Sequence, residues 1–302
     1  MNLSTFNAFK HLNNAGIGIT VEGEMLKKCQ KVILRILEDV IALCEKENIC
    51  YQLSGGTALG AVREHGFIAW DDDIDMNVRA GDIERLRELI IKNYPDKYTF
   101  ADYRIKNYGL PMIKIMLNNT IFRDRESYSS EHCGFFIDIF PIENVPDNPI
   151  LRKIHGCLCM VSGGLLSCRK FFMNRKLMLK LAEKNPGIKS VVRTKILIGG
   201  LISFLPLSTW AKITNYLYGL CKNESSKYVS IPSGKKHYFG EMYLREGMMN
   251  TIKMPFEGHQ WNVAKDYDNY MKVLYGPDYM IPSPPDKREH HVLLELKFPE
   301  EM

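Results

Sequence analysis

The apolar residues near the start of the chain follow a helical pattern. Between Glu22 and Asn48 they recur at steps of three and four residues. The positions concerned are Met25, Cys29, Val32, Ile33, Ile36, Leu37, Val40, Ile41 and Cys44. Such spacing predicts a long amphipathic helix that lies with its apolar side on a core.

After this helix the pattern changes to short apolar segments that are typical of strands. Residues 49–53 predict a strand that runs into a Ser-Gly-Gly turn, and Thr57 suits the N-cap or first turn of a short helix ending at Arg63. The next expected elements, in chain order, are a strand at 74–78, a helix at 82–93 and strands at 112–117 and 135–140. Helices packed on a small mixed sheet, in the α/β or α+β class, account for this order.

Composition narrows the class of protein. The chain has 302 residues, of which 45% are hydrophobic and 25% are charged, as in an ordinary globular protein. Its eight cysteines include no CxxC pair, which disfavours a zinc ribbon or a disulfide framework and favours reduced, buried thiols. Residues 1–7 do not resemble a signal peptide, and no stretch approaches the roughly 18 apolar residues of a membrane-spanning helix. We therefore expect a cytoplasmic protein.

Positive charge is concentrated in one part of the chain. Residues 169–195 contain nine Lys or Arg and one acidic residue, Glu183, and apolar segments at 157–166 and 196–207 flank them. One interpretation is a helical hairpin with a solvated basic face. The second is docking on an anionic membrane surface, such as the inner face of the cytoplasmic membrane, or on an acidic glycan; near a membrane each basic residue contributes about 1 kcal/mol. The net charge of +5 is too modest to indicate nucleic acid.

The segment from Gly55 to Asp75 carries the strongest chemical signal. A Gly-Gly pair opens it, and four aspartates close it: Asp71, Asp72, Asp73 and Asp75. Glycines let backbone N–H groups approach a phosphate, and carboxylates at i and i+2 of a strand can share a hard cation. Asp138 adds a carboxylate inside an apolar strand, where it is costly unless it is paired or binds a ligand. Together these features predict a phosphate site beside a Mg²⁺ site.

Calcium loops and the common nucleotide or hydrolase motifs fit the acidic cluster less well. An EF-hand starting at Asp71 would need glycine where Met76 stands and glutamate where Asp82 stands. The chain has no P-loop, dinucleotide-binding, HExxH or nucleophile-elbow motif. A solvated acidic turn is disfavoured because Trp70 and Ile74 bracket the cluster with apolar side chains.

Residues 51–79 resemble the signature of the LicD family of phosphocholine transferases. That family is similar to fukutin and fukutin-related protein and belongs to the nucleotidyltransferase-fold superfamily. The likeness continues at residues 134–141, 256–258, 274–276 and 284–291. The chain departs from the family pattern at Glu64, where His is usual, at Ala69, where Pro is usual, and near Ala264, where a proline is missing.

The resemblance and the shifts in composition together imply three parts. These are a nucleotidyltransferase-like catalytic core at 1–149, a basic helical insertion at 150–225 and a C-terminal segment at 226–302 that completes the active site. Family members transfer a phospho-substituent from a CDP-linked donor such as CDP-choline to a sugar hydroxyl and release CMP. The expected acceptor is a cell-surface glycan or its lipid-linked precursor. A CDP-ribitol or CDP-glycerol phosphotransferase is one alternative, and a non-catalytic nucleotide- or glycan-binding module is another.

The resemblance also assigns roles to the acidic and glycine residues. Asp73 and Asp75 are the expected ligands of Mg²⁺, or of Mn²⁺, at the DxD position. Asp138 is the third carboxylate, which either ligates the metal or positions and deprotonates the acceptor hydroxyl. The backbone of Gly55, Gly56 and Thr57 would hold a phosphate at a helix N-terminus.

Further residues are expected around the donor. The candidates for binding substrate are Arg63, Asp71, Lys114, Arg288, His290 and His291. Arg63 would bind a phosphate or pair with the aspartates, and Lys114 would reach the donor phosphates or lie at the surface. If the head group is choline, aromatic rings should surround its ammonium. The candidate rings are Trp70, Trp261, Tyr275 and Tyr279, each of which could instead be a core aromatic.

Overall fold

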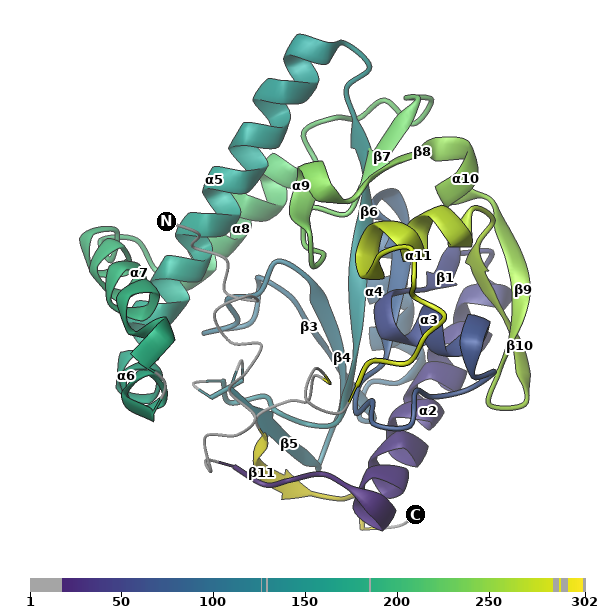
Figure 1. Ribbon diagram of the computed structural model, residues 1–302, viewed down its shortest axis with the longest axis horizontal. Helices are drawn as coiled ribbons and strands as arrows, with labels where there is room; N and C mark the ends of the chain where they lie inside the picture. Colours follow the sequence, from purple (N-terminus) through teal and green to yellow (C-terminus); the bar gives the residue numbers. More distant parts are fainter. Residues whose placement is uncertain are drawn as a thin grey trace.

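The computed structural model describes residues 18–125, 127–128, 130–184, 186–284, 288 and 293–300, and it has a mixed α/β architecture (Figure 1). The strands are β1 (Tyr51–Leu53), β2 (Asp75–Arg79), β3 (Tyr98–Ala101), β4 (Ile113–Leu117), β5 (Ile121–Asp124), β6 (Phe136–Val145), β7 (Tyr228–Ser230), β8 (Met242–Leu244), β9 (Thr251–Phe256), β10 (His259–Ala264) and β11 (Leu293–Lys297). The helices are α2 (Gly23–Lys46), α3 (Gly55–Arg63), α4 (Ile83–Asn93), α5 (Pro149–Met173), α6 (Arg175–Lys184), α7 (Lys189–Leu201), α8 (Leu207–Tyr218), α9 (His237–Gly240), α10 (Arg245–Met249) and α11 (Tyr267–Tyr275). The expected α/β class is confirmed.

The central sheet places β6 between two strands that are distant in sequence. Its path is β1-β2-β6-β4-β3, and β7 and β8 extend it from the second half of β6. Only the β2–β6 pair among the described strands is parallel. As a result, the strand that follows the acidic cluster lies directly beside the strand that carries Asp138.

The first predicted helix is confirmed as α2, which packs on the sheet. Its buried stripe contains ten residues, from Leu26 to Cys44, and all ten belong to the main core. Met25, which the sequence pattern assigned to the apolar side, is exposed at the edge of this stripe. The helix contacts β6 and so supports the strand that carries Asp138.

The basic part of the chain forms four helices, α5 to α8, instead of a two-helix hairpin. Helix α5 packs against α7 along one part of its length and against α8 along another. Small apolar clusters separate from the main core hold this region together. In Figure 1 these helices lie to the left of the sheet, on the other side of the molecule from the β9–β10 hairpin.

The residues after Ser225 return to the sheet. Strands β7 and β8 pair with each other beside β6, the β9–β10 hairpin lies next to β1, and α11 contacts α3. The C-terminal part of the chain therefore lies against α3, whose first turn holds the Gly-Gly pair.

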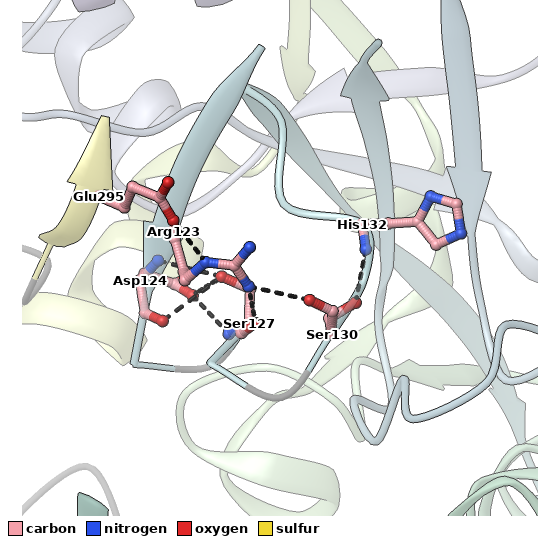
Figure 2. A network of polar contacts seen from close by, with 6 residues as sticks. All are labelled: Arg123, Asp124, Ser127, Ser130, His132 and Glu295. Carbon is pink, nitrogen blue, oxygen red and sulfur yellow. Dashed lines mark hydrogen bonds and ion pairs between the residues drawn. The ribbon is translucent and has the colours of Figure 1, made fainter. Parts of the chain in front are cut away.

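A polar network joins the two-stranded β5–β11 sheet to the loop that follows β5 (Figure 2). Arg123 contacts Glu295 at 3.0 Å and donates to the carbonyl oxygens of Ser127 and Ser130. Asp124 Oδ1 accepts from both the backbone N–H and the hydroxyl of Ser127, each at 2.6 Å. These side chains bond to one another, which is typical of a structural turn.

Composition predicts no membrane-spanning helix and mostly buried, reduced cysteines. No helix in the described ranges combines the length and the apolar character needed to cross a membrane. All eight cysteines are free; five are buried, as expected, whereas Cys157 is exposed.

Candidate active site

Three charged residues form one row across the centre of the sheet. Asp75 on β2 is the register partner of Asp138 on β6, and Asp138 is the partner of Lys114 on β4. Directly paired residues of neighbouring strands point to the same face. The two aspartates and the lysine therefore share one face, and the strand order brings together residues that lie up to 63 positions apart.

Lys114 and Asp138 form a buried ion pair. The Lys114 Nζ atom lies 3.1 Å from Asp138 Oδ1 and 3.4 Å from Oδ2, and the two residues are 1% and 5% exposed. The same ammonium lies over the ring of Phe136. Each charge offsets the cost of burying the other. The interpretation of Lys114 as a surface lysine is therefore wrong, and its ammonium is turned toward the carboxylate row.

The glycine turn faces the aspartates at close range. Gly55 has φ +50°, and a Cβ added there would overlap Asp75 Oδ2. A Cβ at Gly56 would lie 2.7 Å from Asp71 Oδ2. The start of α3, with the N–H groups of its first turn and its partial positive charge, therefore lies against two carboxylates.

Thr57 links this turn to the strand. Its Oγ1 accepts a hydrogen bond from the backbone N–H of Asp75 at 2.8 Å, and Ser54 N donates to the Asp75 carbonyl at 3.0 Å. Thr57 thus fixes the position of Asp75, a role in addition to the expected phosphate contact.

Gly55→Ala should lower both stability and activity by more than Gly23→Ala. The two glycines each begin a helix with similar φ, +50° and +57°, but a Cβ at Gly23 meets nothing within 4 Å. The backbone cost of about 1 kcal/mol is therefore shared, and only Gly55→Ala must also displace Asp75. Thermal unfolding and CMP release, measured on both variants, separate these effects. Equal losses would show that the contact with Asp75 has no consequence.

Tyr270 on α11 holds the start of α3 in place. Its hydroxyl lies 2.8 Å from Ser54 Oγ and accepts from Gly55 N at 3.2 Å and from Asn77 Nδ2 at 3.4 Å. Burial raises the pKa of this phenol, which stays neutral. Sequence reasoning missed Tyr270; the helical spacing of Tyr270, Met271 and Leu274 was the available signal.

Tyr275 lies at the other end of α11 and is 36% exposed. Burial of its hydroxyl, followed by Asp75, Tyr270, Asp71 and Asp73, raises the pKa of Tyr275 well above its ordinary value. The negative charge of the acidic segment therefore raises the pKa of this phenol, and Tyr270 on the same helix contacts the start of α3.

A lysine that sequence reasoning missed lies over this tyrosine. Lys235 Nζ is 5.4 Å from the centroid of the Tyr275 ring. Its loop is held by Glu241, which is 2% exposed and accepts from the Lys236 N–H at 2.7 Å. Burial raises the pKa of Glu241 to about 7. This anchored loop presents a cation over the Tyr275 ring.

Two expected arginines occupy different places. Arg63 ends α3, where its Nη1 donates to the Tyr279 carbonyl at 3.0 Å and its Nε contacts Glu64 at 2.7 Å. These contacts hold the segment after α11 against α3, at the opposite end from the glycine turn. Arg288 lies with its guanidinium carbon 4.0 Å from the centroid of the Trp70 ring, next to the acidic segment. His290 and His291 lie outside the described residues.

The four candidate aromatic residues differ in how much of each side chain is exposed. Trp261 and Tyr279 are 5% and 8% exposed and belong to the main core, so they are core aromatics. Trp70 is half-buried beneath Arg288. Tyr275 is the most exposed of the four, and its hydroxyl is acted on by the charge of Asp75, Asp71 and Asp73.

A metal ion would meet two or three carboxylates here. No three His, Cys, Asp or Glu side chains within the described ranges form a ready-made metal-binding group. Mg²⁺ usually takes one or two protein carboxylates together with waters and substrate phosphates. Asp75 and Asp138 on neighbouring strands, with Asp73 two residues away, fit that requirement. The three-ligand set stays a prediction.

A sequence model of the family described as LicD/FKTN/FKRP, nucleotidyltransferase domain, matches residues 48–153. The match runs from β1 to the start of α5 and contains the glycine turn, the acidic segment, Lys114 and Asp138. Residues 48–153 therefore match the nucleotidyltransferase domain of that family. The resemblance noted from the sequence is thereby confirmed.

Similarity to known proteins extends beyond the matched domain. The chain is 27% identical over 283 residues to the lipopolysaccharide cholinephosphotransferase LicD of Haemophilus influenzae, covering 88% of this chain and 96% of the relative. It is also 30% identical over 142 residues to an uncharacterized protein of Rickettsia prowazekii, covering 41% of this chain and 52% of that protein. The first alignment is long enough to include most of the helical and C-terminal parts as well.

Proposed function

We propose that this LicD-family protein is a phosphotransferase that moves phosphocholine from CDP-choline to a hydroxyl group of a cell-surface glycan and releases CMP. The row of Asp75, Asp138 and Lys114 beside the glycine start of α3 carries the proposal. The Haemophilus influenzae relative, named for lipopolysaccharide, supports a glycan acceptor of that kind. Teichoic acid or a lipid-linked glycan precursor has the same acceptor chemistry.

The residues at the site have different proposed roles. Asp73, Asp75 and Asp138 would hold Mg²⁺, or Mn²⁺, which neutralises the diphosphate and stabilises the departing CMP when bound. The N–H groups at the start of α3 bind a phosphate oxygen. Lys114 fixes the Asp138 carboxylate, which in this proposal accepts a hydrogen bond from the acceptor hydroxyl.

The head group is assigned to Tyr275. The Lys235 ammonium already lies over its ring, so this face accepts a positive group. A quaternary ammonium gains about 0.5–2 kcal/mol from such a contact. Lys235 would then leave the ring and face the donor phosphates, and Arg288 over Trp70 would add a second positive charge next to the acidic segment.

A donor screen tests the proposal. Purified protein with glycan precursor and Mg²⁺ should release CMP from CDP-choline, and EDTA should stop the release. CDP-ribitol and CDP-glycerol serve as matched donors that lack the ammonium. Turnover of CDP-glycerol or CDP-ribitol alone would favour the alditol-phosphate alternative.

Thermal shift with the same three donors separates the third alternative from the first two. A ligand that binds only the folded protein stabilises it, by about 2.7 kcal/mol at 100 times its Kd. Stabilisation by a CDP compound without CMP release under any condition would favour a non-catalytic binding module. No stabilisation and no release would contradict the proposal as a whole.

A further inference from the structure

Helix α5 exposes an apolar stripe along its first half. Ile150, Ile154, Leu158 and Val161 are 69%, 52%, 41% and 61% exposed, and they recur at steps of four, four and three residues. Leu151, at 56%, widens the stripe. A soluble helix normally turns such a stripe toward a core, and this one faces solvent.

A neighbouring face of α5 packs within the protein. His155 Nε2 lies 2.9 Å from the Leu217 carbonyl, and Thr214 Oγ1 donates to the Ser162 carbonyl at 3.3 Å. These contacts attach α5 to α8. The exposed stripe is therefore a second apolar face, in addition to the one that packs within the protein.

Exposed apolar residues gather in this part of the chain more generally. Twelve of the 22 exposed large hydrophobic residues in the described ranges fall between positions 150 and 220, which is less than a quarter of the sequence. Leu201 in α7 and Phe204 after it are 73% and 74% exposed. Scattered single hydrophobic residues are normal at surfaces, but a run of them along one face of a helix, as in α5, marks an interaction surface.

Charge points to the nature of the partner. Residues 149–221 contain twelve Lys or Arg and one acidic residue, Glu183, for a net charge of +11. Since the whole chain carries +5, the remainder has a net charge of −6. The exposed basic residues of the region are Lys153, Arg175, Lys176, Lys180, Lys189, Arg193 and Lys212.

We infer that the stripe Ile150–Leu151–Ile154–Leu158–Val161 and the basic residues of α5–α8 form a docking surface for an anionic lipid membrane. Apolar side chains that enter the head-group region and lysines that meet anionic lipids are the two components of interfacial binding. A second copy of this chain fits less well, because it would bring +11 against +11. The inference concerns a surface away from the carboxylate row and does not rest on the proposed activity.

Vesicle sedimentation tests this inference. The full-length protein should pellet with vesicles of phosphatidylglycerol and phosphatidylcholine, and at least tenfold less with pure phosphatidylcholine. Raising NaCl from low to high concentration should release it, because screening weakens the electrostatic part. Binding that is equal to both vesicle types, or absent from both, would overturn the inference.

Two paired variants locate the surface. Ile154→Ser with Leu158→Ser should reduce binding at least tenfold, whereas Ile91→Ser, at an exposed isoleucine of α4 in the acidic remainder, should leave it unchanged. Circular dichroism checks that each variant is folded. Equal binding by both variants would place the contact elsewhere.

Analytical ultracentrifugation without lipid tests whether a second copy of the chain covers the stripe instead. The inference expects the same sedimentation coefficient for the wild type and for the Ile154→Ser/Leu158→Ser variant. A wild-type dimer that the double substitution dissociates, together with no vesicle binding, would show that the stripe joins two copies of the chain.

Discussion

Asp75→Asn should reduce CMP release at least about 10²–10³-fold, the size of effect seen when one electrostatic group is removed from an active site. The substitution keeps the shape of the side chain and removes its charge. The backbone bonds of Asp75 to Thr57 and Ser54 do not involve the carboxylate, so the strand should form as before. Initial rates with CDP-choline and acceptor at saturating Mg²⁺ measure the loss.

Asp96→Asn is the matched control, since it makes the same chemical change at an exposed residue of the turn before β3. We expect wild-type rates from it. The melting temperature of Asp75→Asn should remain within a few degrees of wild type, which separates lost chemistry from lost folding. Full activity in a folded Asp75→Asn protein would remove Asp75 from the site and, with it, the DxD assignment.

Local pattern was enough to predict the elements around this site. The steps of three and four residues in 22–48 yielded α2, and the Ser-Gly-Gly turn correctly marked the junction of β1 and α3. Helix α3 begins at Gly55, two residues before the N-cap position considered for Thr57. That difference arises because Gly55 adopts a positive φ, which lets the helix start directly at the turn.

Which residues meet across the sheet could not be predicted from pattern. Asp138 and Lys114 each stood out as polar residues in apolar strands, so the sequence indicated that both needed partners. Their mutual pairing depends on β4 lying antiparallel beside β6, in one particular register. Strand order and register result from packing of the whole core, which no local window contains.

The residues that sequence reasoning missed come from the C-terminal part of the chain. Tyr270 reaches Ser54 across 216 positions, and Lys235 reaches Tyr275 from a separate loop. Arg63 is a residue that the sequence placed too close to the phosphate site. It lies near the glycine turn in the sequence, but it ends the nine-residue helix α3, and its side chain contacts Tyr279 at the far end.

Lys114→Met should destabilise the protein by about 3–5 kcal/mol, because it leaves the Asp138 carboxylate buried without this cation. Methionine keeps the length and the apolar stem of lysine, so little volume is lost. Chemical denaturation, followed by tryptophan fluorescence, measures the change in free energy of unfolding. Lys253→Met is the control: its pair with Glu45 is about half exposed on both sides, and breaking it should cost about 1 kcal/mol or less.

The double variant Lys114→Met/Asp138→Leu distinguishes a charge effect from a packing effect. Replacing a buried ion pair by apolar residues of similar size is often neutral or stabilising, so the double variant should recover most of the stability lost in Lys114→Met. It should nevertheless release no CMP, because Asp138 is gone. Recovery of stability without activity would mean that the Lys114–Asp138 pair serves the reaction and lowers the free energy of unfolding relative to apolar residues. If Lys114→Met is as stable as Lys253→Met, the lysine does not neutralise Asp138 in solution, and a role for Lys114 at the donor phosphates is then favoured.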